Sequence, residues 1–351
     1  MELLKKTNRN GMPRDFGTRT ELMRLLDLDA SLLRQAQRRF PVRWPRYYLD
    51  LIEDDPQRDP IARMGKPTAA EFAPDPGDLS DPVADRRLRP IPFVVRKHTD
   101  RMIILTTKKC HFYCRFCFRR EDPPTRSAEP GVGDWERIYA FLADHPEIEE
   151  PILSGGDPLT LTDKHLLEIG TRFNRIPSVK RWRIHSRAPV HYPARLSENL
   201  VRALTAGKPL TLVTHYNHPK ELTHESRRIA RLLEDAGITY KNQAVLLAGV
   251  NDRPEVQREL WAGLADLGIL AYYLHHPDRA QGNAAFRLSL RRGLAIYSGL
   301  RQIYAGPLPR YVIDLPDGRG KVPVMDLVPE TAGNYSYRHP DGSRSHFCDV
   351  D

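Results

Sequence analysis

Three of the chain's four cysteines lie in the run Cys110-His111-Phe112-Tyr113-Cys114-Arg115-Phe116-Cys117-Phe118-Arg119-Arg120. Three residues separate Cys110 from Cys114, and two separate Cys114 from Cys117. Thiolates this close in sequence can bind one inorganic centre if the backbone loops around it. Three thiolates leave the fourth corner of a [4Fe–4S] cube without a cysteine from this loop. An iron with an open position can bind a substrate, as an open catalytic metal site does.

A zinc site or buried free thiols would also account for these cysteines. Zinc takes a fourth nearby Cys or His ligand, and the paired spacing of a zinc ribbon is absent from the chain. His111 and the distant Cys348 could still complete such a site. The spacing alone therefore leaves both alternatives open.

The composition is that of an ordinary globular protein, with 40% hydrophobic and 28% charged residues. Its 351 residues can form one large domain with an elaboration or two modest domains. No apolar run approaches the ~20 residues that cross a bilayer, and residues 1–10 contain no apolar signal core. Clustered cysteines do not form a disulfide framework. We therefore expect a cytoplasmic protein with no membrane partner.

The net charge of +9 invites comparison with nucleic-acid-binding proteins, in which clustered Lys and Arg neutralise phosphates. Here the basic residues are interspersed with acidic ones along the whole chain, and no recognised nucleic-acid motif is present. We expect no nucleic-acid partner. Small anionic ligands could account for several of the arginines.

The chain divides into three parts by composition. Leucines recur at helical spacing between residues 22 and 33, and prolines at positions 41 and 45 interrupt the pattern. Residues 74–92 are rich in Pro and Asp and contain a Gly, and these residues resist regular structure. We expect an N-terminal helical region and linker at 1–95, a main domain at 96–325 and a tail at 326–351.

The main domain alternates apolar runs with amphipathic stretches. The runs suit buried strands and lie at residues 102–107, 151–154, 182–186, 210–215, 240–247, 271–275 and 311–315. Two of the amphipathic stretches end at a glycine, Gly237 and Gly268, as helices often do. Alternation of this kind predicts an α/β fold with a parallel sheet, open or closed.

Two glycine-containing segments follow predicted strands. Ser154-Gly155-Gly156-Asp157 would let backbone approach a ligand closely, although a plain turn would look the same. Asp314-Leu315-Pro316-Asp317-Gly318-Arg319-Gly320-Lys321 could project a lysine amine into a cavity. A desolvated lysine beside cationic groups has a lowered pKa and acts as a Schiff-base nucleophile. A solvated lysine in a flexible turn is the alternative.

The cysteine run resembles the cluster loop of the radical S-adenosylmethionine (SAM) enzymes, and the chain from about residue 100 to 325 resembles the lysine 2,3-aminomutase family among them. The resemblance is carried by the cysteine run, Ser154-Gly155-Gly156-Asp157, Arg183-Ile184-His185-Ser186-Arg187-Ala188-Pro189-Val190, Thr214-His215-Tyr216-Asn217-His218-Pro219, Asn242-Gln243 and the Lys321 segment. It implies a partial (β/α)6 barrel with ligands at the carboxyl ends of the strands.

The resemblance also implies the cofactors and the residues that hold them. Cys110, Cys114 and Cys117 would bind a [4Fe–4S] cluster, and Ser154, Gly155, Gly156 and Asp157 would bind SAM. Lys321 would be the catalytic residue that carries pyridoxal 5′-phosphate (PLP). Lys97 and Arg187 would lie near the PLP phosphate, and His215 and Gln243 near its ring.

The substrate implied by the resemblance is L-lysine, which an isomerase would convert to β-lysine (3,6-diaminohexanoate). Arg119 would bind the substrate carboxylate, and Asp278 and Asp314 the distal ammonium. A glutamate 2,3-aminomutase and the branch that makes β-lysine for elongation factor P are close alternatives. An iron–sulfur module without PLP is an alternative of another class; histidines such as His215 could be ordinary core residues in it.

The resemblance finally implies an electron donor such as flavodoxin or ferredoxin, and we expect a homo-oligomer. Family members with a longer C-terminal tail bind structural zinc through extra cysteines there. Because the tail of this chain contains only Cys348, we expect no zinc site.

Overall fold

A computed structural model of the protein describes residues 15–53, 55–120, 129–331 and 333–349. Its centre is a nine-stranded sheet whose strands follow one another in sequence order. The strands from β2 to β8 are parallel, and β1 and β9 pair antiparallel at the two ends. The sheet consists of β1 (Val94–Val95), β2 (Arg101–Thr107), β3 (Glu150–Gly155), β4 (Trp182–His185), β5 (Leu210–Thr214), β6 (Thr239–Val245), β7 (Leu270–His275), β8 (Arg310–Asp314) and β9 (Lys321–Pro323).

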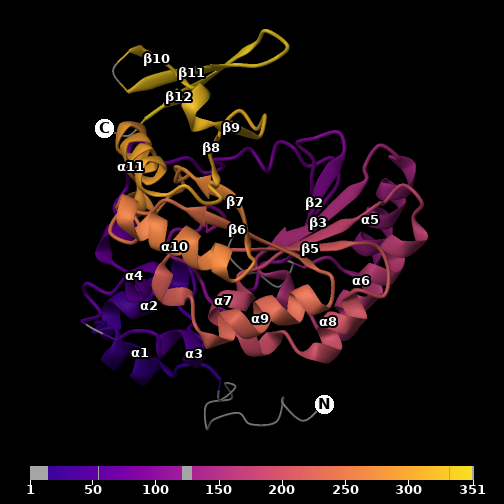
Figure 1. The fold of residues 1–351 in the computed structure, drawn as a ribbon, viewed down its shortest axis with the longest axis horizontal. Coiled ribbons are helices and arrows are strands. Elements are labelled where there is room, and N and C mark those ends of the chain that lie inside the picture. Colours follow the sequence, from indigo (N-terminus) through magenta and orange to yellow (C-terminus); the bar gives the residue numbers. More distant parts are fainter. Residues whose placement is uncertain (1–14, 54, 121–128, 332, 350–351) are drawn as a thin grey trace.

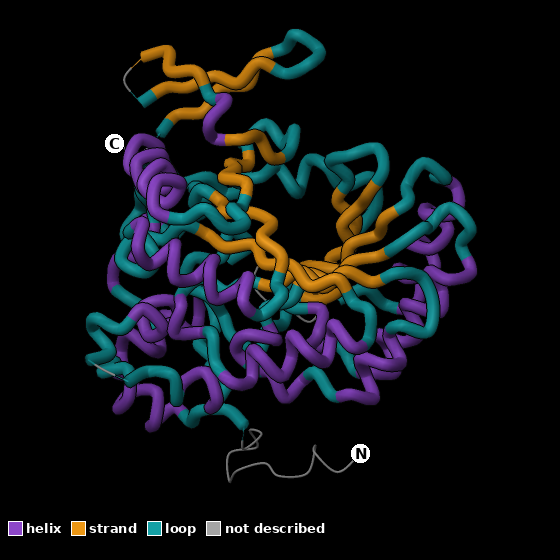
Figure 2. The backbone as a smooth tube through the Cα atoms, viewed as in Figure 1, coloured by secondary structure: helices purple, strands orange, loops and turns teal. Residues whose placement is uncertain are grey.

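Helices connect each parallel strand to the next. They are α5 (Val132–Asp144), α6 (Asp163–Arg175), α7 (Ala188–His191), α8 (Glu198–Leu204), α9 (His224–Asp235), α10 (Pro254–Asp266) and α11 (Leu290–Ile303), with short 3₁₀ turns η2 (Pro158–Thr160), η3 (Pro193–Arg195), η4 (Pro219–Glu221) and η5 (Ala284–Phe286). Figure 2 shows the sheet curving around an opening, with these helices on its outer side. The prediction of an α/β fold built as a partial (β/α)6 barrel is confirmed.

Burial on both faces explains why the strands read as apolar runs. In β3 the first five residues are all buried, because helices cover one face and the interior of the barrel lies on the other. The helices are amphipathic instead. In α9, Ile229, Ala230 and Leu233 face the core, and Thr223 caps the first turn by accepting a hydrogen bond from the Ser226 amide.

The N-terminal helices pack beneath the barrel (Figure 1). They are α1 (Arg19–Leu25), α2 (Ala30–Arg39), α3 (Arg46–Leu49), α4 (Pro60–Gly65) and the 3₁₀ turn η1 (Ala69–Phe72). Their core is continuous with that of the barrel, since the Trp44 and Tyr48 rings lie 4.7 and 4.8 Å from the Phe112 ring of the cysteine loop. Gly65 is required at this contact, because a Cβ there would lie 2.4 Å from Phe112.

A small antiparallel sheet follows the barrel and stands out from it (Figure 1). After the 3₁₀ turn η6 (Val324–Asp326) it comprises β10 (Val328–Thr331), β11 (Asn334–Arg338) and β12 (Arg344–Cys348). Phe347 is buried, and the Leu290 amide at the start of α11 donates a hydrogen bond of 2.7 Å to Asp349. These contacts fasten the tail to the barrel.

Within the described residues, no helix has the length and apolar character that a membrane crossing requires. Residues 1–14, on which the expectation about a signal segment rests, lie outside the described part of the chain.

Candidate active site

One cavity of about 570 Å³ lies inside the barrel and opens at the carboxyl ends of its strands. All the residues to which the family resemblance assigns a role line it: Lys97, Cys110, Cys114, Cys117, Arg119, Ser154, Gly155, Gly156, Asp157, Arg187, His215, Gln243, Asp278, Asp314 and Lys321. The fold therefore brings together residues that are spread over more than two hundred positions of the sequence. Their individual roles remain predictions.

The cysteine loop follows β2 and is held from below by the N-terminal helices. The Arg115 amide donates to the Met64 carbonyl oxygen at 2.9 Å, and the Arg115 guanidinium forms a buried ion pair with Glu71. Burial raises the pKa of all three cavity thiols, that of Cys117 to about 11. The three free thiols line the same cavity and supply three of the four corners of a [4Fe–4S] cube, so the donor set fits an iron–sulfur cluster with one open iron.

The described residues contain no group of three His, Cys, Asp or Glu side chains placed to hold a single metal ion. A [4Fe–4S] cube makes a different demand, because each thiolate ligates a different iron. His111 points away from the cavity, with its Nε2 3.3 Å from the Leu159 carbonyl oxygen.

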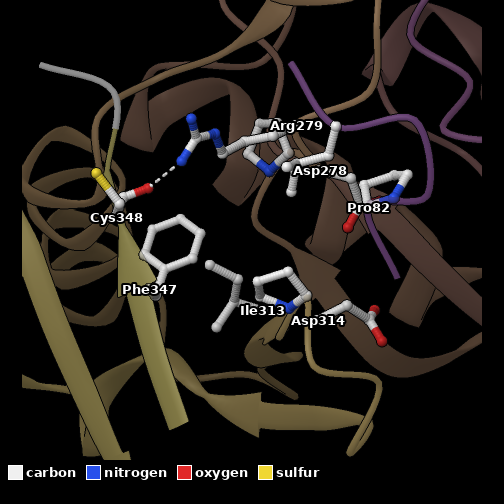
Figure 3. A pocket seen from close by; sticks show the side chains of 10 residues that line it. Pro82, Asp278, Arg279, Ile313, Asp314, Phe347 and Cys348 are labelled. Atoms are coloured by element: carbon white, nitrogen blue, oxygen red, sulfur yellow. Dashed lines mark hydrogen bonds between the residues drawn. The ribbon is translucent and has the colours of Figure 1, made fainter. Parts of the chain in front are cut away.

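Cys348 lies at a separate small pocket between β12 and the loop after β7 (Figure 3). There the Arg279 guanidinium donates to the Cys348 carbonyl oxygen at 2.7 Å. The tail thus supports, from outside, the loop that carries Asp278.

The two glycines after β3 are required by a close approach of backbone. A Cβ on Gly155 would lie 2.4 Å from the Thr107 carbonyl oxygen, and Gly155 has a φ of +116°. A Cβ on Gly156 would lie 2.4 Å from the Lys109 carbonyl oxygen. The end of β3 therefore packs directly on the backbone that leads into Cys110.

The Asp157 carboxylate fixes the backbone turn at the start of α7, a role that the sequence did not predict. Its carboxylate accepts hydrogen bonds from Ser186 Oγ at 2.6 Å, from the amides of Arg187 and Ala188 at 3.1 and 3.0 Å, and from the Leu159 amide at 3.0 Å. Both oxygens are committed to fixing the turn that begins α7. The expectation that Asp157 contacts SAM together with Ser154, Gly155 and Gly156 stays a prediction.

A hairpin places Lys321 opposite Asp314. The two residues are paired across β8 and β9, and Gly318 and Gly320 in the connecting turn have φ values of +77° and +93°. Asp317 precedes Gly318, and Arg319 lies between the two glycines. Neither has a positive φ, so their side chains are compatible with the turn.

The pKa of Lys321 shifts in the direction opposite to the one that the sequence suggested. Burial alone would lower its pKa, but Lys321 Nζ lies 3.2 Å from Asp314 Oδ2 and the ion pair raises it. The expected lowered pKa was wrong because the nearest partner is a carboxylate rather than a cation. Burial, together with the charge of Asp314, raises the pKa of the neighbouring Asp278 to about 7.

Arg119 and Lys97 share one carboxylate, Asp85, which the sequence analysis missed. Asp85 Oδ2 accepts from Arg119 Nε and Nη2 at 3.0 and 2.7 Å, and Lys97 Nζ lies 3.1 Å from Asp85 Oδ1. Burial would raise the pKa of Asp85, but the two cations lower it to about 2. No pattern marked this residue, because it lies in the irregular segment read as a linker.

His215 and Gln243 contact each other through their Nε2 atoms. With the Gln243 amide in this orientation its nitrogen donates, so His215 Nε2 accepts and the ring is neutral. Burial agrees with this, since it lowers the pKa of His215 to about 3. His185 was also missed: its Nε2 is buried in the cavity wall and has no hydrogen-bond partner among the described residues.

Arg187, which we expect near the PLP phosphate, lines the cavity and lies against the cysteine loop. Its Nη1 donates to Cys114 Sγ at 2.9 Å, and its Nη2 donates to Glu221 Oε1 at 2.6 Å. Burial would lower the pKa of Arg187, but its contacts with Cys114, Tyr48 and Glu221 raise it, so the guanidinium stays charged. Lys97 contacts Asp85 and the Val83 carbonyl oxygen instead. The expectation that both cations lie near the PLP phosphate stays a prediction.

Curated relatives cover most of the chain, whereas no family model matches it. The L-lysine 2,3-aminomutase of Clostridium subterminale is 37% identical over 280 residues, which are 80% of this chain and 67% of the relative. The L-lysine 2,3-aminomutase of Escherichia coli (strain K12) is 36% identical over 313 residues, 88% of this chain and 91% of the relative. The glutamate 2,3-aminomutase of Clostridioides difficile (strain 630) is 31% identical over 312 residues, 89% of this chain and 74% of the relative.

Among solved structures, that of Streptococcus suis SuiB bound to S-adenosylmethionine superposes with a TM-score of 0.42 and 16% identity, covering 61% of this chain and 47% of the other.

Proposed function

The chain belongs to the L-lysine 2,3-aminomutase family, and from this premise we propose that it is a radical SAM, PLP-dependent isomerase that converts L-lysine to β-lysine. The observation that carries the choice of lysine is the acid pair in the cavity. Asp278 follows β7 and Asp314 ends β8, and these strands are neighbours in the sheet. Two carboxylates on one wall suit a ligand with a distal ammonium.

The cysteine loop and the ends of β3 and β9 would hold the cofactors. Cys110, Cys114 and Cys117 would ligate the cluster, and the backbone around Gly155 and Gly156 would contact SAM. Lys321 would carry PLP, because its side chain lines the cavity next to the buried Asp314. When bound, the cluster and SAM supply a radical, and PLP supplies a carrier for the migrating amino group.

The chain's own residues would control the proton on Lys321. Its amine must be unprotonated to attack a carbonyl. Asp314 Oδ2, 3.2 Å from Lys321 Nζ, is the acceptor within reach, and Asp278, with a pKa of about 7, can hold a proton at neutral pH. Arg119 would bind the substrate carboxylate through its planar guanidinium. Because His215 is neutral, it would not compete with Arg119 for the substrate carboxylate.

Glutamate is the second candidate substrate, because one relative is named a glutamate 2,3-aminomutase. A glutamate side chain would place a third carboxylate beside Asp278 and Asp314. Buried like charges without a partner typically cost several kcal/mol. We therefore infer a strong preference for lysine.

The test is anaerobic incubation of the reconstituted protein with SAM, a reductant and either lysine or glutamate, followed by product analysis. We expect β-lysine from lysine and little turnover of glutamate. Equal turnover of the two would overturn the substrate while leaving the reaction type in place. Absence of any β-amino acid, from protein with its full iron content, would overturn the reaction itself.

The assignment of PLP has its own test. Borohydride reduction and peptide mapping should place a pyridoxyl group on Lys321, and Lys321→Ala should purify without PLP absorbance. Labelling of another lysine would contradict the assignment. A cytoplasmic location, a flavodoxin or ferredoxin as electron donor, and a homo-oligomeric state remain predictions of the family resemblance.

A further inference from the structure

We propose that Arg187 tunes the reduction potential of the cluster held by the cysteine loop, and that Glu221 sets the strength of this effect. The inference deepens the proposed function and rests on it, since it concerns the same cluster. It assigns to Arg187 a positioning and electrostatic role that is separate from binding of PLP or substrate.

Direct contact with sulfur is the first observation. Arg187 Nη1 donates to Cys114 Sγ at 2.9 Å, and Cys114 is the middle thiol of the loop. A charge-assisted hydrogen bond to a ligating thiolate stabilises negative charge at the centre. Reduction adds one electron to the cluster, so a cation at this distance favours the reduced form.

The guanidinium is also held in one position. Its Nη2 donates to Glu221 Oε1 at 2.6 Å and to the Tyr48 hydroxyl at 3.0 Å, and its Nε donates to the His215 carbonyl oxygen at 3.0 Å. Glu221 is itself fixed, because Tyr48 donates to Oε1 at 2.6 Å and the His218 amide donates to Oε2 at 3.0 Å. The contact with Cys114 therefore belongs to a rigid arrangement rather than to a mobile side chain.

Burial makes these charges effective over the short distance to the cluster. The Arg187 side chain is 7% exposed, and Glu221 and Tyr48 are fully buried. With water excluded, charges are screened weakly. Arg187 then favours the reduced cluster, while Glu221, on the other side of the guanidinium, opposes it. Arg187 should therefore raise the reduction potential of the cluster, and Glu221 should lower it.

The experiment compares Arg187→Gln and Glu221→Gln in anaerobically reconstituted protein by redox titration with EPR detection. For Arg187→Gln we expect the ratio of reduced to oxidised cluster at a fixed potential to fall about tenfold, a shift of about 59 mV to more negative potential. For Glu221→Gln we expect a shift of the opposite sign. Simple structural damage would not produce opposite signs.

If a single variant folds poorly, the double variant Arg187→Gln, Glu221→Gln still tests the proposal. It removes both charges of the buried ion pair, so no unpaired charge remains in the interior. Its potential should lie close to that of the unmodified protein. Tyr47→Phe is the matched control: Tyr47 is adjacent to Tyr48 on α3, but its hydroxyl bonds to Thr223 at 2.6 Å, so the potential should not move.

Unchanged potentials in both single variants, or shifts of the same sign, would overturn the role of Arg187 while leaving the cluster in place. Absence of a cluster from the unmodified protein would instead overturn the proposed function. Iron and sulfide content, measured on every variant, separates these outcomes.

Discussion

At the scale of single residues, the site is governed by a few buried carboxylates and the cations that share them. Asp314 holds Lys321, Asp85 holds both Arg119 and Lys97, and Asp278 lies beside Asp314 with a pKa raised to about 7 by burial and by that neighbour. Each carboxylate therefore sets the charge or the orientation of a group that faces the cavity.

The raised pKa of Asp278 predicts a pH dependence. Below about pH 7 the group is neutral and no longer attracts an ammonium ion, so kcat/KM for lysine should fall as the pH is lowered through this value. The measured pKa will belong to the Asp278–Asp314 pair. Asp278→Asn should lower kcat/KM by about 2–4 kcal/mol at pH 8 and remove this limb of the profile. A profile that is unchanged in Asp278→Asn would contradict the assignment.

Asp85 is predicted to position Arg119. Asp85→Asn removes the charge that fixes Arg119 Nε and Nη2, so KM for lysine should rise by about 2 kcal/mol, or roughly thirtyfold, while kcat changes little. Steady-state kinetics on lysine measure this split. Asp85→Glu keeps the charge and should recover part of the loss, whereas equal losses in kcat for both variants would indicate a merely structural role.

At the scale of elements, the periodicity of apolar residues predicted the parallel strands of the sheet. It did not predict the strand β9 or the side-chain contacts at the carboxyl ends of the strands. Seven apolar runs matched strands from β2 to β8 because burial on both faces selects such residues. The short strand β9 was missed, since a Gly-rich turn hides its pairing with β8. The bond from Arg187 to Cys114 could not be predicted either, because it joins side chains that are far apart in sequence and depends on how β4 lies beside the cysteine loop.

The close approach at the end of β3 leads to a prediction for Gly156. A Cβ there would lie 2.4 Å from the Lys109 carbonyl oxygen, and backbone cannot move aside cheaply. Gly156→Ala should displace the segment that leads into Cys110 and lower the iron bound per chain after reconstitution. Gly170→Ala is the control: in α6 a Cβ would lie at an ordinary 3.5 Å from Trp182, and Ala favours a helix by about 1 kcal/mol.

Iron content and thermal unfolding of the two glycine variants measure the difference. We expect less iron in Gly156→Ala and an unchanged or higher Tm in Gly170→Ala. Full iron content in Gly156→Ala would show that the loop does not depend on this contact.

At the scale of the whole molecule, the N-terminal helices and the barrel form one structure around the cysteine loop. The irregular segment that composition suggested as a boundary contributes Val83 and Asp85 to the cavity wall, so it belongs to the site. Composition could not reveal this, because Pro, Asp and Gly resist helices and strands equally in a linker and in a fixed loop. Ion pairs connect the N-terminal region to the cysteine loop. Glu71 on η1 pairs with Arg115 and Arg120 of the loop, and all three side chains are buried.

This buried triad gives the last prediction. Burial would raise the pKa of Glu71, but Arg115 and Arg120 lower it, so the carboxylate remains charged and contributes stability above the usual pKa of a glutamate; that contribution is lost as the pH falls through its lowered value. Glu71→Gln leaves two buried guanidinium groups without their anion, which typically costs about 3–5 kcal/mol. Urea unfolding at neutral pH should show this loss, together with weaker retention of iron.

The matched control is an exposed pair. Arg96 and Glu147 lie 2.6 Å apart, but their side chains are 22% and 41% exposed, so water and salt screen the interaction. Glu147→Gln should therefore leave both the free energy of unfolding and the bound iron nearly unchanged. Equal effects of the two substitutions would mean that the N-terminal helices do not support the cysteine loop through Glu71.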